Sequence, residues 1–141
     1  MTKAENQLGN RPIPFHFCHG DFTPWNCKQV GPTLLLYDWE YASRERPAGW
    51  DIIRFFVQTQ RFLERRSPGE IRLSFGTDGC AGRVLREHLA YLGAEQDLAN
   101  GLVTLYLLDE LAFHAAENPT ETGALRLVAS LLNLIILGTD G

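Results

Sequence analysis

The chain has 141 residues, of which 45% are hydrophobic and 21% are charged, and its formal net charge is −4. This length and composition are those of one globular domain with its own core, and they exclude a disordered chain. The mild negative charge provides no basic surface for nucleic acid or for an anionic membrane, so we expect neither as a partner.

We expect a cytoplasmic protein. The N-terminal residues M-T-K-A-E-N-Q-L-G-N are polar and do not resemble a signal peptide. The longest apolar run, Leu131 to Leu137, is shorter than the roughly 20 residues that a membrane span needs. Three cysteines, Cys18, Cys27 and Cys80, are an odd number, which favours free thiols in a reducing compartment over a disulfide framework.

The sequence divides into four regions within one domain, residues 1–12, 13–60, 61–80 and 81–141. The first region is polar and is expected to be a flexible lead-in. The alternating pattern of P-F-H-F-C-H-G, residues 14–20, predicts a short strand. The segments C-K-Q-V and T-L-L-L-Y-D-W flank the turn pair Gly31-Pro32, and this arrangement predicts a β-hairpin.

Helices dominate the rest of the chain. Residues 43–49 are expected to form a loop, and residues 50–65 carry apolar side chains at helical spacing. The glycine-containing residues 66–79 predict a linker or partly ordered loop. Three helices are expected after it: one that stops at Gly93, one that ends before Pro119, and one capped by Thr120 or Thr122. The order of strands followed by helices predicts a predominantly helical α+β fold.

The loop H-G-D-F-T-P-W-N, residues 19–26, lies between two predicted strands, and hairpin pairing returns Asp38 toward Asn26. Asp21 can accept a proton from an attacking hydroxyl group, whereas Asn26 and Asp38 offer the hard oxygen ligands that Mg²⁺ prefers. These are the parts that phosphoryl transfer needs, since its catalysis is mostly positioning and charge neutralisation. The spacing from His19 through Asp21 to Asn26 also equals that of the kinase pattern H-R-D-x-x-x-x-N.

Taken together, H-G-D-F-T-P-W-N, Y-D-W-E-Y-A and P-A-G-W-D-I-I-R-F-F resemble the aminoglycoside phosphotransferase and choline kinase-like family, a branch of the protein-kinase-like fold. The resemblance is strong over residues 13–60, and the later helices fit only in pattern. It implies a kinase-like C-terminal lobe in which a small hairpin carries the catalytic loop. The site residues that the resemblance implies are the catalytic base Asp21, the supporting residues His19 and Asp51, the Mg²⁺ ligands Asn26 and Asp38, and Glu40 as a further metal candidate. Asp51 would open a helix and brace the loop through its backbone N–H groups.

The resemblance implies transfer of a phosphoryl group from ATP, or another nucleoside triphosphate, to the hydroxyl group of a small molecule. In kinase-like enzymes a glycine-rich loop and a strand lysine precede the catalytic loop. Only 18 residues precede His19 here, and Lys3 is the only lysine among them. We therefore expect a C-terminal lobe that is inactive alone. It would be a fragment of a longer kinase, a truncated gene product, or one half of an enzyme whose N-terminal lobe is a partner chain.

Two other functions remain open. A degenerate, non-enzymatic kinase lobe would act as a binding or oligomerisation module, and a homodimer is expected because an uncovered apolar cleft face tends to find a partner. A zinc module would use His16, Cys18, His19 and Cys27, although the paired spacing typical of zinc sites is absent.

Four further residues have two interpretations each. Asp109 and Glu110 are candidates for binding a cationic acceptor, by resemblance to acidic residues of the family's lower lobe. A solvated helix face explains them as well and is the favoured interpretation. Trp25 and Trp39 could stack on a ligand, but we expect them to be core residues wedged beneath the loop.

Overall fold

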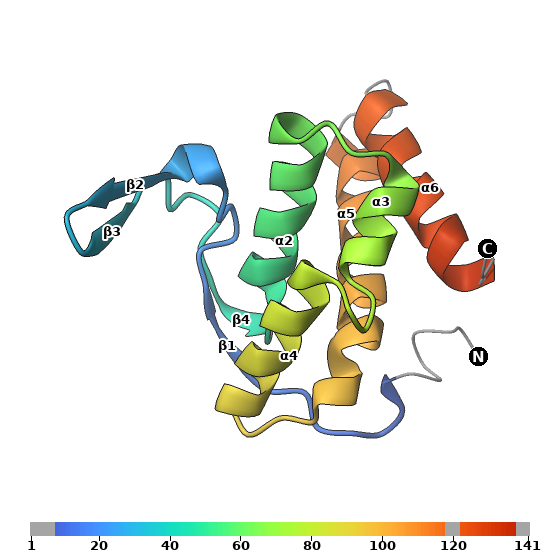
Figure 1. The fold of residues 1–141 in the computed structure, drawn as a ribbon, viewed down its shortest axis with the longest axis horizontal. Helices are drawn as coiled ribbons and strands as arrows, with labels where there is room; N and C mark the ends of the chain where they lie inside the picture. Colours follow the sequence, from blue (N-terminus) through green and yellow to red (C-terminus); the bar gives the residue numbers. More distant parts are fainter. Residues whose placement is uncertain (1–7, 118–121, 138–141) are drawn as a thin grey trace.

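The computed structural model describes residues 8–117 and 122–137. Two small antiparallel sheets come first and a helical body follows, so the fold is α+β (Figure 1). The strands are β1 (Phe15–Cys18), β2 (Cys27–Val30), β3 (Thr33–Leu36) and β4 (Ser43–Pro47). The α-helices are α2 (Trp50–Gln58), α3 (Pro68–Ser74), α4 (Cys80–Tyr91), α5 (Ala99–Glu117) and α6 (Thr122–Leu137). Short 3₁₀ turns cover Pro24–Asn26 and Gln96–Leu98, and Thr59–Leu63 is π-helical.

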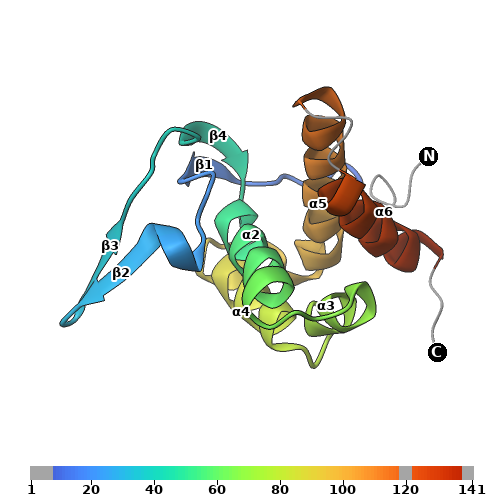
Figure 2. The same ribbon diagram turned by 90° about the horizontal axis from the view of Figure 1, so that it is seen from above.

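The predicted hairpin is present. Strands β2 and β3 pair antiparallel from Val30 opposite Thr33 to Cys27 opposite Leu36, and Gly31 in the turn has a φ of 59°. Only glycine adopts such a left-handed conformation at little cost, so the turn pair sets the register. The hairpin projects away from the helices in both views (Figures 1 and 2).

The second sheet corrects the expectation of a loop over residues 43–49. Strand β4 pairs antiparallel with β1, with Phe15 opposite Pro47 and His16 opposite Arg46. The segment S-R-E-R-P has no alternating apolar pattern, so its strand character comes from pairing with β1 and not from its own composition.

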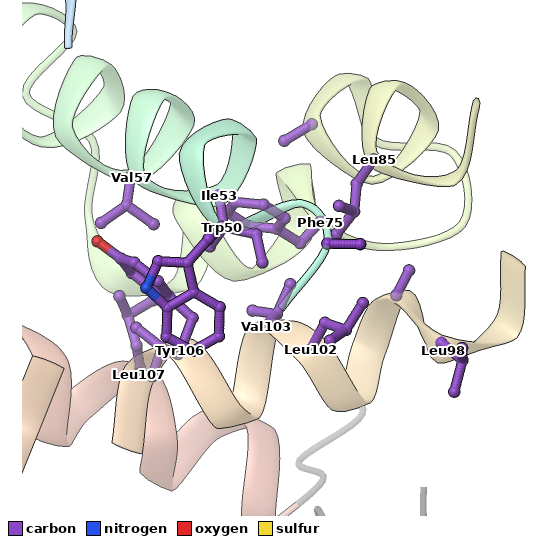
Figure 3. Packing of buried hydrophobic residues seen from close by; sticks show 14 of the residues in the cluster. Trp50, Ile53, Val57, Phe75, Leu85, Leu98, Leu102, Val103, Tyr106 and Leu107 are labelled. Carbon is purple, nitrogen blue, oxygen red and sulfur yellow. The ribbon is translucent and has the colours of Figure 1, made fainter. Parts of the chain in front are cut away.

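The helical body encloses the core. Helix α2 packs against both α4 and α5, which also contact each other, and it contributes Trp50, Ile53 and Val57 to the interior that the three helices share (Figure 3). The rings of Trp50 and Tyr106 meet edge to face with their centroids 5.2 Å apart. Ile53 is fully buried, as are core residues of α4 and α5. Burial of these apolar side chains is the main stabilising contribution to the folded domain.

The region expected to be a linker, residues 61–80, contains helix α3, which corrects that prediction. Ser67 and Glu70 form a reciprocal capping box, and Pro68 occupies the first turn, where its missing N–H group costs nothing. Ile71 is fully buried, so α3 packs into the core. The sequence S-P-G-E carried this helix-start signal.

The later helices follow the predictions closely. Helix α4 ends at Tyr91, and Gly93 just beyond it has a φ of 71°, as expected of a glycine stop signal. The expected stop before Pro119 and the cap at Thr120 concern residues outside those described, and Thr122 begins α6. Within residues 8–117 and 122–137, no helix has the length and hydropathy needed to cross a membrane.

Candidate functional site

Asp51 fixes the backbone of the H-G-D loop. It lies in the first turn of α2, and its carboxylate accepts hydrogen bonds from His19 N at 2.8 Å and from Gly20 N at 3.0 Å. This is the contact expected of Asp51. Gly20 has a φ of 83°, and a Cβ at this position would clash with the carbonyl group of Tyr41. The loop geometry therefore needs glycine here.

His19 joins the loop to the hairpin. Its side chain is buried, and its Nε2 lies 2.8 Å from the carbonyl oxygen of Tyr37. Asp21 N donates to His19 Nδ1 at 3.3 Å, so Nδ1 is the acceptor and Nε2 carries the proton that is donated to Tyr37. His19 thus occupies a supporting position between the loop and the end of β3.

Asp21 and Asn26 are directly connected. The side-chain Nδ2 of Asn26 donates to Asp21 Oδ2 at 2.8 Å and to the Asp21 carbonyl oxygen at 3.0 Å. Asn26 is buried and Asp21 is partly buried. Because the amide nitrogen is held by Asp21, the amide oxygen lies on the other arm of the planar group, where another ligand can take it.

Asp38 and Glu40 follow the hairpin and are exposed. Tyr37 N donates to the carbonyl oxygen of Asn26 at 2.9 Å, which brings the end of β3 beside Asn26, and Asp38 then turns the chain with a φ of 62°. The negative charge of Glu40, more than burial or the charges of Asp21 and Asp38, raises the pKa of Tyr41.

Arg54 is a site residue that the sequence analysis missed. Its Nε and Nη2 lie 2.8 and 2.7 Å from Asp21 Oδ1, and its Nη1 lies 3.0 Å from Glu110 Oε1 and 3.4 Å from Tyr106 Oη. Burial alone would lower the pKa of Arg54, but Tyr106, Glu110 and Asp21 together raise it above its usual value. The signal in the sequence was a charged residue three positions after Asp51 in a helix that is otherwise apolar up to Gln58.

Asp109 and Glu110 differ from each other. Asp109 is exposed and pairs with Arg46 at 3.1 Å, as a solvated helix face would have it. The side chain of Glu110 is only 14% exposed and binds Arg54, with His114 Nε2 3.6 Å from its other oxygen. The favoured interpretation of a solvated face is therefore wrong for Glu110, because the folding of α5 against α2 turns this side chain inward.

The tryptophans correct a further expectation. Trp25 and Trp39 are 52% and 46% exposed, so neither is a core residue. The Trp39 ring lies against His19 with centroids 4.4 Å apart, and Trp25 meets Phe62 edge to face. Trp39 therefore covers His19 from the solvent side.

The donor chemistry differs between the two metals considered. An amide oxygen of Asn26 and the exposed carboxylate of Asp38 are hard ligands that suit Mg²⁺, which usually takes one or two carboxylates together with phosphate oxygens and water. No group of three or more His, Cys, Asp or Glu side chains is poised around a metal position in the described part of the chain. Burial, aided by the charge of Asp51, raises the pKa of Cys18 to about 11, and Cys27 Sγ donates to the carbonyl oxygen of Thr23.

Comparison with protein-family models, with curated proteins and with solved structures finds no match to this chain.

Proposed function

We propose that this chain is the C-terminal lobe of a small-molecule kinase, which transfers a phosphoryl group from ATP to the hydroxyl group of an acceptor. The observation that carries the proposal is the held loop: Asp51 binds the backbone of His19 and Gly20 while Asn26 binds the carboxylate of Asp21. The resemblance implies the first of these contacts, in which Asp51 braces the loop through its backbone N–H groups. Two chain segments, the loop of residues 19–26 and the first turn of α2, supply these contacts.

In this proposal Asp21 orients the acceptor hydroxyl group and accepts its proton, while Asn26 and Asp38 hold Mg²⁺. A bound Mg²⁺ would supply neutralisation of the charge that develops on the phosphates. Residues 8–18 contain no lysine and one glycine, so they offer neither a strand lysine nor a glycine-rich loop for the phosphates. We therefore propose little or no kinase activity for this chain by itself.

Calorimetric titration with Mg²⁺ and ATP tests the proposal. The expected result is binding that Asp38→Ala abolishes and that Asp78→Ala leaves unchanged. Asp78 is a suitable control because it is an exposed acidic residue between α3 and α4. No heat from the unaltered chain, or equal heat from Asp38→Ala, would contradict a magnesium–nucleotide half-site.

A second candidate function is a non-enzymatic module that binds through the β2–β3 hairpin. Leu34 and Leu35 are 53% and 41% exposed, and successive strand residues point to opposite faces. Neither face of this hairpin is therefore covered by the described part of the chain. A two-stranded hairpin is marginally stable in water, so a partner that covers it would stabilise it.

Light scattering coupled to size exclusion tests this second function. Self-association through the hairpin predicts a mass above the 15.9 kDa of one chain. Leu35→Lys should restore the monomer, whereas Leu73→Lys, at an exposed leucine of α3, should not. A monomer at all concentrations would count against oligomerisation.

A further inference from the structure

We infer that Arg54 is a positioning residue for Asp21, and that it leaves Oδ2 as the oxygen that accepts the proton of the acceptor hydroxyl group. The inference rests on the proposed function, because it assigns a task at that same site. Three features carry it: the place of Arg54 on α2, the contacts of each Asp21 oxygen, and the support that Arg54 receives from α5.

Helix α2 holds the loop in two ways. Asp51 and Arg54 are three positions apart, so they lie on the same face of the helix. Asp51 binds the loop backbone at His19 and Gly20, and Arg54 binds the side chain of Asp21. One helix therefore sets both where the loop runs and how its carboxylate is turned.

The contacts distinguish the two carboxylate oxygens of Asp21. A carboxylate has about four lone-pair positions, two on each oxygen. Nε of Arg54 donates to Oδ1 at 2.8 Å, and Nη2 forms an ion pair with the same oxygen at 2.7 Å, so both nitrogens approach Oδ1. Asn26 Nδ2, at 2.8 Å, takes one position of Oδ2, and no other donor in the described residues bonds to that oxygen. Oδ2 is thus the oxygen that the Arg54 guanidinium leaves open, and it lies beside the amide group proposed to bind Mg²⁺.

Helix α5 keeps the Arg54 guanidinium in place. Nη1, which does not contact Asp21, donates to Glu110 and to the Tyr106 hydroxyl group. The side chains of Arg54, Asp21 and Glu110 are 21%, 17% and 14% exposed, so water screens these contacts only in part. A guanidinium group reaches both carboxylates because its nitrogens form a rigid fork, whereas lysine has a single nitrogen. Arg54→Lys therefore keeps the charge and loses the geometry.

Nuclear magnetic resonance of the chain without Mg²⁺ or nucleotide tests the inference. The side-chain amide protons of Asn26 report on Oδ2, because Asn26 donates to that oxygen. In Arg54→Lys and in Arg54→Gln we expect these protons to exchange with water about tenfold faster, the effect of losing one hydrogen bond. Arg83→Lys, at an exposed arginine of α4, should leave the exchange unchanged. The backbone amides of His19 and Gly20 should keep their protection in all three variants.

Two results would overturn the inference. Unchanged Asn26 exchange in Arg54→Lys would mean that Arg54 does not orient the carboxylate. Loss of protection at His19 and Gly20 together with Asn26 would mean that Arg54 only holds the loop together. If Arg54→Gln fails to fold, Arg54→Lys decides alone. The resonance experiment contains no nucleotide, so its outcome does not depend on the titration with Mg²⁺ and ATP. Failure of the proposed Mg²⁺–nucleotide site and failure of the Arg54 inference can therefore be distinguished.

Discussion

The helical body and the two-sheet region differ in how their side chains are buried. In the body, from α2 to α6, Ile53, Leu85 and Leu102 are fully buried. In residues 15–47, large apolar side chains are exposed by about half or more at Phe15, Phe17, Trp25, Val30, Leu34 and Tyr41. The body therefore depends on apolar packing, and the sheet region has little such packing of its own.

Polar contacts to α2 compensate for this in the loop. His19, Gly20 and Asp21 are each held by Asp51 or Arg54, two residues of the same helix. The candidate site therefore lies outside the apolar core, but its geometry is set by side chains of the helical body. Damage to the core should lower global stability, whereas damage to the polar contacts should alter the site locally.

The largest effect is expected from Leu102→Ala in α5. Leu102 is fully buried, so the substitution leaves a cavity and should lower the free energy of unfolding by about 3 kcal/mol. Urea unfolding followed by circular dichroism measures this loss. Leu73→Ala, at a side chain that is 66% exposed, should change it by less than about 0.5 kcal/mol. Equal losses of unfolding free energy in the two variants would contradict the conclusion that the helical body depends on its buried apolar side chains.

Gly20→Ala should have the next largest effect on the free energy of unfolding. The positive φ of Gly20 costs a non-glycine residue about 1–2 kcal/mol, and the added Cβ also clashes with the Tyr41 carbonyl group. Gly93 also has a positive φ but has open space around it, so Gly93→Ala should show the backbone cost alone. Urea unfolding compares the two variants, and a smaller loss in Gly20→Ala than in Gly93→Ala would contradict the close approach to Tyr41.

Asp51→Asn tests the polar attachment of the loop. The amide keeps one acceptor oxygen and loses the charge, so the hydrogen bonds to His19 and Gly20 should weaken by about 1–2 kcal/mol. Hydrogen exchange should show faster exchange at these two amides and unchanged protection in α5. Asp78→Asn, with the same change of charge at an exposed position, serves as the control. Loss of exchange protection throughout α5 as well would show that the loop does not open independently of the helical body.

The smallest effect concerns the contact between the two regions at His16 and His88, whose ring centroids are 5.8 Å apart. Burial, and then the charge of His16, lowers the pKa of His88 below its usual value. The folded state then binds fewer protons than the unfolded chain, so stability should fall as the pH drops through about 6.5 and below. His88→Gln should flatten this slope in urea unfolding between pH 7.5 and 5.5, and an unchanged slope would contradict the prediction.

Local signals predicted several elements correctly. Gly31-Pro32 indicated the hairpin turn, and Gly93 marked the end of α4 because a left-handed residue is needed there. The family resemblance of residues 19–26 and Asp51 implied the contact of Asp51 with the loop backbone, but not the bonds of Asp21 to Asn26 and Arg54. The capping box at Ser67 is also readable in the sequence, but the glycines that flank α3 are equally typical of a linker and mask its start.

The hairpin turn, the end of α4 at Gly93 and the order of strands and helices follow from the sequence alone, because these depend on backbone preferences of a few neighbouring residues. Tertiary structure alone decided three other features. Strand β4 forms because β1 lies beside it, Glu110 turns inward because α5 packs on α2, and Arg54 meets Asp21 because the loop returns to the same helix. Each of these rests on contacts between residues more than 20 positions apart, and such contacts leave no periodic pattern in the chain.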